Sequence, residues 1–181
     1  MINGPLYYAY FKHQAETHPD LLHVDEDNLV FAQVSLEEAI GDLRSANISA
    51  SSYIMRLFRP SFRFSPAEMM PAKNWDGGFL IARKHDTRNQ GSEDFSAAID
   101  GCERIGEDII EKMYADSANG HPLFQGRAHT NLTITGRELP VTGDGGYGGW
   151  LFLWSLPVQF TYCQPATRAA WTDGGTTPFA L

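Results

Sequence analysis

The sequence predicts an α+β fold in which two to three helices pack on a mostly antiparallel sheet. Three observations lead to this prediction: two long segments repeat apolar residues at three- and four-residue steps, a third alternates them at every second position, and turn residues separate the segments. The 181 residues, 43% of them hydrophobic, suit one domain of this kind. We assign residues 1–163 to this α+β domain and residues 164–181, rich in Thr, Gly, Ala and Pro, to a C-terminal arm.

The N-terminal part of the chain predicts a helix, a strand and a second helix. Residues 5–22 repeat apolar side chains at helical steps, and Pro19 is expected to end or kink this helix. A short strand is expected over residues 29–34. Ser35 and Glu38 then have the spacing of a capping box, in which each residue satisfies the backbone of the other at a helix start.

The middle of the chain predicts two strands joined by a loop. Residues 52–64 read as a long aromatic strand, and because Pro60 cannot donate to a sheet ladder, an edge position or a bulge is expected there. Residues 65–76 contain two prolines and read as a loop. The Asp-Gly-Gly sequence at 76–78 favours a hairpin turn, after which residues 77–84 form the next strand.

Residues 92–116 give the strongest helix signal. One stripe is apolar and contains Phe95, Ile99, Cys102, Ile105, Ile109 and Met113. Asn119-Gly120 is a plausible C-cap. The acidic face of the helix is formed by Asp100, Glu103, Glu107 and Glu111, which we expect to face solvent or a lumen. Glutamates four residues apart repel by roughly 0.2–0.5 kcal/mol per pair. This cost to helix stability favours a functional role for the negative charge on this face.

The C-terminal part predicts strands. One or two short strands are expected within residues 121–141, and the Gly-rich residues 142–149 read as a flexible turn. Residues 150–163 form the clearest strand, because large apolar side chains occupy every even position. These are Trp150, Phe152, Trp154, Leu156, Val158, Phe160 and Tyr162.

The charge balance argues against tight binding of nucleic acid. The chain has 22 acidic and 14 basic residues, a net charge of −8. A protein that grips DNA by its phosphates needs a basic surface. DNA passing beside the protein without tight binding is compatible with an acidic surface, because like charges repel.

No motif in the sequence predicts a cofactor, a metal or catalysis. Residues 143–148 fit G-x-G-x-x-G, but a strand follows where a dinucleotide site needs a helix. His13, His18 and His23 are five residues apart and do not share a helix face, as metal ligands would. We therefore predict no enzyme activity, no cofactor and no metal.

The sequence also lacks the marks of export or membrane insertion. Cys102 and Cys163 are expected to be free thiols, and there is no signal peptide or long apolar segment. We expect synthesis in a reducing cytoplasm and no membrane partner.

Exposed-looking hydrophobic side chains predict an interface, since such residues are enriched at interface cores. Three of these side chains lie in the loop over 65–76, one in the turn over 142–149 and two in the arm. The alternative to an interface is that these side chains fold back onto the domain. They are Met69, Met70, Trp75, Tyr147, Trp171 and Phe179.

The order of the elements resembles a family of small phage virion proteins, the tail-terminator or tail-completion (neck) proteins, and phage proteins of Bacteroidetes hosts have a similar look. The resemblance is carried by four segments: Tyr10-Phe11-Lys12-His13, Val34-Ser35-Leu36-Glu37-Glu38, the helix from Ile99 to Tyr114, and Gly149-Trp150-Leu151-Phe152-Leu153. The arm has no counterpart in the family.

This resemblance implies a non-enzymatic structural protein located in the virion. Copies of the chain would form a ring, commonly a hexamer, that contacts the tail tube and the neck or connector proteins and lets DNA pass. Two alternatives remain from the residues alone: a cytoplasmic enzyme or small-ligand-binding protein whose site is dispersed in the sequence, and a host-cell interaction module.

Overall fold

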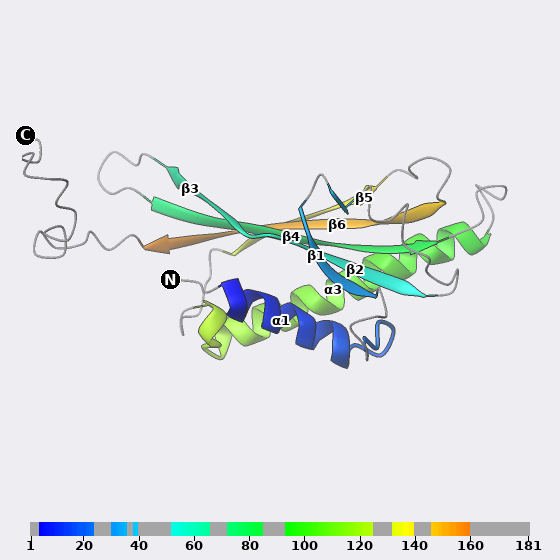
Figure 1. Cartoon of the computed structure of the whole chain (residues 1–181), viewed down its shortest axis with the longest axis horizontal. Coiled ribbons are helices and arrows are strands. Elements are labelled where there is room, and N and C mark those ends of the chain that lie inside the picture. The colour runs from blue at the N-terminus through cyan, green and yellow to red at the C-terminus, as the bar shows by residue number, and fades with distance from the viewer. Residues whose placement is uncertain are drawn as a thin grey trace, which may run out of the picture.

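The computed structural model describes residues 4–23, 30–35, 38–39, 52–65, 72–84, 93–124, 132–139 and 146–159. Two long helices pack on a six-stranded sheet, which confirms the predicted α+β class (Figure 1). The helices are α1 (Gly4–Thr17) and α3 (Glu93–Ala118), with a short 3₁₀ turn η2 (Pro122–Phe124). The strands are β1 (Phe31–Val34), β2 (Tyr53–Phe58), β3 (Ser61–Ser65), β4 (Ala72–Lys84), β5 (Thr133–Leu139) and β6 (Tyr147–Gln159).

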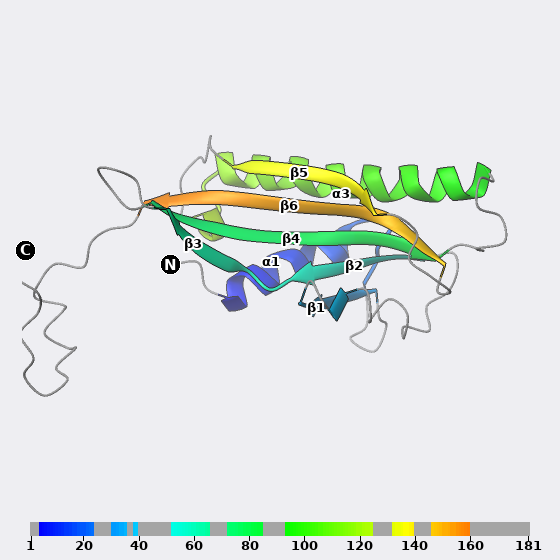
Figure 2. The same ribbon diagram turned by 90° about the horizontal axis from the view of Figure 1, so that it is seen from above.

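The sheet is mixed but mostly antiparallel. Its strand order is β1-β2-β4-β6-β5, and β3 pairs with the start of β4 (Figure 2). Only β1 and β2 are parallel among the described strands. The long strands β4 and β6 form the centre of the sheet, while β1 and β5 lie at its two edges.

Helix α1 buries the face that the sequence predicts. Tyr7, Tyr10, Phe11, Gln14 and Ala15 are its buried residues. The helix is shorter than predicted and ends at Thr17. Pro19 cannot continue it, and residues beyond the helix end form a turn in which Leu22 is 56% exposed.

The capping box is confirmed by two reciprocal hydrogen bonds. The backbone N–H of Glu38 donates to Ser35 Oγ at 3.1 Å, and the backbone N–H of Ser35 donates to Glu38 Oε2 at 2.9 Å. These bonds lower the pKa of the Glu38 carboxyl. Most of the helix predicted to follow lies outside the described residues, but Ala39 is buried against the sheet.

The bulge predicted at Pro60 is also confirmed. Leu57 lies opposite Phe79, while Ser61 lies opposite Asp76. Three residues, 58–60, therefore face only two on β4, which is the defining mismatch of a β-bulge.

The loop predicted over 65–76 and the turn predicted at 76–78 are wrong in part. Strand β4 runs without interruption from Ala72 to Lys84 and includes both glycines. A side chain at Gly77 would collide with the indole of Trp154, and one at Gly78 with the backbone of Phe152. These glycines therefore permit close packing within the sheet instead of a change of chain direction.

Helix α3 matches its prediction closely. Cys102, Ile105, Ile109 and Met113 are buried on the predicted stripe. The helix ends in a Schellman motif: Gly120 has a φ of 76°, its N–H donates to Ser117 O at 3.2 Å, and the N–H of His121 donates to Asp116 O at 2.9 Å.

The sheet has two apolar faces. We call the side covered by α1 and α3 (Figure 1) the helix face. There the aromatic side chains of β4 and β6 pack with those of the two helices. A second buried cluster on the other side, the far face, includes Ile54, Leu80 and Leu151. The even positions of β6 lie on the helix face, with Phe152 and Trp154 buried, as predicted; residues 160–163 lie outside the described residues.

Candidate interaction surface

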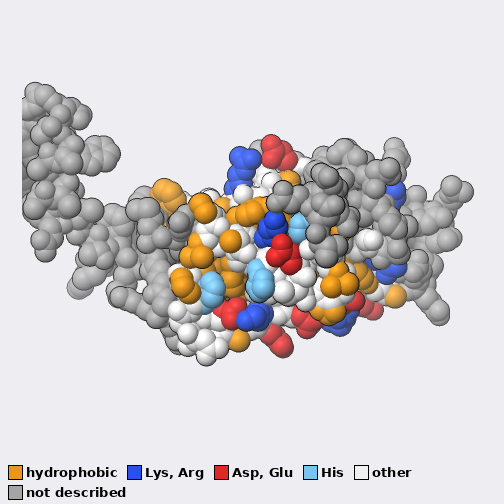
Figure 3. Space-filling model, turned by 60° about the horizontal axis from the view of Figure 1, so that its bottom comes forward, with side chains coloured by type: hydrophobic (Ala, Val, Ile, Leu, Met, Phe, Trp, Pro, Cys, Tyr) orange, Lys and Arg blue, Asp and Glu red, His pale blue; other side chains and the backbone are white. Residues whose placement is uncertain are grey.

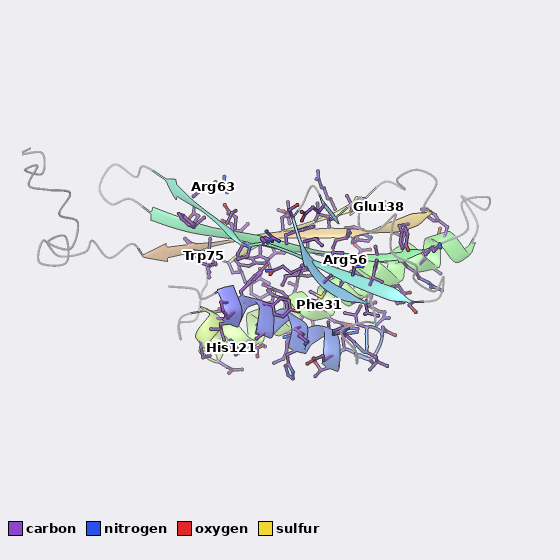
Figure 4. All side chains as sticks on the ribbon, in the orientation of Figure 1. Phe31, Arg56, Arg63, Trp75, His121 and Glu138 are labelled. Carbon is purple, nitrogen blue, oxygen red and sulfur yellow. The ribbon has the colours of Figure 1, made fainter. Side chains whose placement is uncertain are left out.

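The C-terminal turns of α3 are joined to α1 by a buried tyrosine. Tyr10 Oη donates to Asp116 Oδ2 at 2.9 Å, and Lys112 on the same helix also bonds this carboxylate. The His121 ring lies 5.0 Å from the Tyr10 ring (Figure 4 labels His121 at the end of α3). Three different elements, α1, α3 and the turn before η2, therefore meet around the Tyr10 side chain.

The pKa values at this contact show which protonation states the fold favours. Burial and the neighbouring Asp116 carboxylate raise the pKa of Tyr10 far above its ordinary value. Partial burial of Asp116 acts to raise its own pKa, but the hydrogen bonds from Lys112 and Tyr10 outweigh burial and the pKa is lowered. The pair is therefore a neutral phenol donating to an ionised carboxylate, which suits a structural contact between helices.

A second polar contact joins the middle of α3 to the turn after α1. His18 Nε2 lies 3.3 Å from Asp108 Oδ2, and Arg104 Nη2 donates to Asp20 Oδ2 at 2.8 Å. Arg104 Nη1 is also 3.6 Å from Asp108 Oδ2. We call this line of contacts, from Asp20–Arg104 to Tyr10–Asp116, the helix seam. Figure 3 shows acidic, basic and histidine side chains side by side on the helix-covered side of the molecule.

The predicted acidic face of α3 lies outside the seam. Asp100, Glu107 and Glu111 are exposed, and Glu103 is half-buried. None of these four carboxylates has an ion pair with another residue of the described part of the chain. Three of the four carboxylates are thus exposed, and within these ranges the charge of all four is uncompensated by salt bridges.

Two residues predicted to be at an interface are instead part of the core. Trp75 is 7% exposed and lies on the helix face, because residue 75 belongs to β4 and not to a loop (Figure 4). Tyr147 is 5% exposed and begins β6 opposite Lys84, packed with the far-face cluster. Met69, Met70, Trp171 and Phe179 lie outside the described residues.

Sequence reasoning missed the buried arginine of β2. Arg56 is fully buried on the far face, and its Nη1 donates to the backbone oxygens of Val30 at 3.3 Å and Met55 at 3.1 Å. The signal was available: Arg56 alternates with Ile54 and Phe58, so one face of an otherwise apolar strand carries a cation. A buried guanidinium bonded to neighbouring carbonyls fixes the position of β1 against β2.

The remaining features concern the buried thiol of Cys102, metal binding and membrane insertion. Burial raises the pKa of the Cys102 thiol to about 12, so it stays protonated near neutral pH. Across the described ranges, His, Cys, Asp and Glu side chains do not gather in threes that could hold a metal ion. Within the same ranges, no helix has the length and apolar character needed to cross a membrane.

Comparison with known proteins does not assign the chain to a family. No family model matches the sequence, and no curated protein is similar to it at a significant level. The resemblance to tail-terminator and tail-completion proteins therefore stays a prediction.

Proposed function

We propose that this chain is a non-enzymatic structural protein of a phage tail or neck, and that its copies assemble into a ring through which DNA passes. The observation that carries the proposal is the acidic face of α3. Its four carboxylates, at Asp100, Glu103, Glu107 and Glu111, lack salt bridges within the described part of the chain and lie on the outer side of the longest helix.

An acidic helix face suits a wall that DNA moves past. The carboxylates from residue 100 to residue 111 extend over roughly 16 Å of helix axis at 1.5 Å per residue. Duplex DNA carries one negative charge about every 1.7 Å of its axis, so the two surfaces repel. A repelling wall keeps a duplex mobile, whereas a basic wall would hold it by its phosphates.

The helix seam supports this role because it fixes where the acidic face points. The Tyr10–Asp116 and Arg104–Asp20 contacts connect α3 to α1 and to the turn after it, at two positions along the helix. A helix that is held on the sheet and along one side cannot rotate to hide its charges. The negative potential is thus a fixed property of the subunit.

Assembly would use segments outside the described residues. Met69, Met70, Trp171 and Phe179 remain the proposed interface residues, and the tail tube and neck or connector proteins remain the proposed partners. Trp75 and Tyr147 leave this set because they are buried within the domain.

Light scattering coupled to size-exclusion chromatography tests the assembly. The full chain, with a mass of 20.1 kDa, should elute as a single multiple of that mass and give rings in negative-stain images. A chain trimmed after Cys163 should keep its circular dichroism spectrum and lose assembly. A full chain that stays monomeric at all concentrations would contradict the ring, and a trimmed chain that still assembles would exclude the arm from the interface.

A gel shift with duplex DNA at low salt tests the acidic wall. We expect no sub-micromolar binding, because tight binding needs several phosphate contacts by Lys or Arg. Sub-micromolar, salt-sensitive binding would contradict the proposal and move the protein toward a DNA-packaging role.

A further inference from the structure

Strand β5 lies at the end of the described sheet. It pairs with β6 from Thr133–Ser155 to Leu139–Gly149, and no other strand of the described part of the chain pairs with its second side. The register is unbroken over all seven residues, and the strand contains no proline. Alternate residues of such a strand direct backbone N–H and C=O groups outward, which makes the edge a template for an added strand.

One flank of α3 faces this edge. The opposite flank carries the seam residues Arg104, Asp108 and Asp116, so helix geometry turns Glu103, Glu107, Ile110 and Tyr114 toward the β5 side. Tyr114 Oη donates to the carbonyl oxygen of Leu132, immediately before β5, at 3.2 Å. Figure 2 shows α3 running along the β5 side of the sheet. We call these four residues the edge flank.

The edge flank combines an apolar strip with negative charge. Ile110 and, on β5, Ile134 are partly buried against the core, and Tyr114 is 44% exposed. Glu103 and Glu107 lie beside them. Glu138 on β5 is opposite Trp150 in the register, so it lies on the same face of the sheet as the helices. These three carboxylates have no ion pair within the described ranges.

We propose that the β5 edge and the edge flank together bind an extended segment of a partner protein, which adds to the sheet as a further strand. The segment carries Lys or Arg at every second residue. Those side chains point to the helix side, where they meet Glu103, Glu107 and Glu138. This site shares Glu103 and Glu107 with the acidic face proposed above, but strand binding at it does not require assembly into a ring.

The two faces of β5 specify the alternation of the segment. On the helix side it meets carboxylates, but on the other side it meets Thr133, Thr135 and Arg137, whose register partners are Ser155, Leu153 and Leu151. A cation on that side would lie near Arg137 and be repelled. The residues between the cations are therefore apolar or Thr, and a segment with basic residues at successive positions binds less well.

Binding of short synthetic peptides to the full chain tests the proposal. The probe is a nine-residue peptide that alternates Lys and Val, and the comparison peptide alternates Glu and Val. We expect the Lys peptide to bind at least about tenfold more tightly, which corresponds to about 1.4 kcal/mol. Amide hydrogen exchange within residues 133–139 should slow by at least a similar factor, because outward N–H groups become bonded.

Two modified Lys–Val peptides separate strand addition from simple charge attraction. One carries N-methyl groups on the odd residues and the other on the even residues. A peptide strand bonds its neighbour through only one of these alternating sets, so one modification should abolish binding and the other should preserve it. Binding that survives both modifications would overturn the proposal.

Matched charge reversals locate the site. Glu103→Lys combined with Glu107→Lys should weaken binding of the Lys peptide at least about tenfold. Asp100→Lys combined with Glu111→Lys makes the same change in net charge on the solvent side of α3 and should weaken it much less. Circular dichroism checks that both variants fold. Equal weakening by the two pairs, no binding by the unmodified chain, or slow exchange of β5 amides that depends on protein concentration in the absence of peptide would each overturn the proposal.

Discussion

The two flanks of α3 use similar side chains in opposite ways. On the seam flank, Asp108 and Asp116 are contacted by His18 and Tyr10, which belong to other segments of the chain, and Asp108 also by Arg104 one turn earlier on α3. The edge-flank carboxylates, Glu103 and Glu107, have no such partners within the described residues. The seam carboxylates stabilise the contact between α3 and the α1 segment, whereas the edge-flank carboxylates remain available to a binding partner.

This difference shows why the number of charges on a helix is a poor guide to their role. Carboxylates one residue apart, Glu107 and Asp108, differ by 100° around the helix. That rotation places Asp108 against His18 and turns Glu107 toward the β5 side, where no described residue pairs with it. The geometry of the neighbouring elements, and not the local sequence, therefore decides which acid stabilises the fold.

The largest expected effect on the free energy of unfolding comes from the core between the sheet and the two helices. Trp154 is 3% exposed on β6, packs against Gly77 and lies 5.9 Å from the ring of Tyr7. Trp154→Ala should lower the free energy of unfolding by about 3–5 kcal/mol, because it leaves a cavity under the helices. Denaturant unfolding measures this loss. A change below about 1 kcal/mol would show that the indole is not a core side chain.

The next effect belongs to the seam. Tyr10→Phe keeps the buried ring and removes the donor to Asp116, so the free energy of unfolding should fall by about 1–2 kcal/mol. Tyr8→Phe is the matched control, since Tyr8 is on the same helix and its hydroxyl makes no hydrogen bond within the described ranges. Equal effects of the two substitutions would mean that the Tyr10 hydroxyl does not stabilise the seam.

Local signals in the sequence predict much of this fold but not the seam. The apolar stripe of α3, the Ser35–Glu38 cap and the bulge near Pro60 depend on residues within a few positions of one another. The seam joins Tyr10 to Asp116, which are 106 positions apart in the chain. No local pattern relates such residues, so only the tertiary structure reveals their contact.

The wrong predictions have a common physical cause. Gly77 and Gly78 have the local signature of a turn, but their lack of a side chain serves contacts with Trp154 and Phe152 on a strand far along the chain. Once β4 continues through them, Trp75 must lie on the helix face. The sequence does not reveal the edge flank either, because Glu103 and Glu107 have the spacing of one acidic face with Asp100 and Glu111, and only the position of β5 distinguishes them.

A smaller effect is expected from pH at the Tyr10–Asp116 contact of the seam. The folded-state pKa of Asp116 is lowered, so its contribution to stability is complete above about pH 4, the unfolded value, and is lost as the pH falls through the folded value. Tyr10 has a raised pKa, so its contribution is lost as the pH rises above about 10. Denaturant titrations of the native chain and Tyr10→Phe should therefore converge at both extremes of pH; a constant difference would contradict this linkage.

The smallest effects give the sharpest contrast, because they compare neighbouring residues with the same change from acid to amide. Asp108→Asn removes the negative charge that lies beside Arg104 and His18 and should lower the free energy of unfolding by about 0.2–1 kcal/mol, the range of exposed pairs. Glu107→Gln removes repulsion from Glu103 and Glu111, each four residues away, and should raise it by about 0.2–0.5 kcal/mol per pair. Denaturant unfolding of both variants at low salt measures the two signs, and high salt should shrink both differences. If both substitutions destabilise the chain, Glu107 has a stabilising partner and the edge flank is not the uncompensated surface that a basic strand would find.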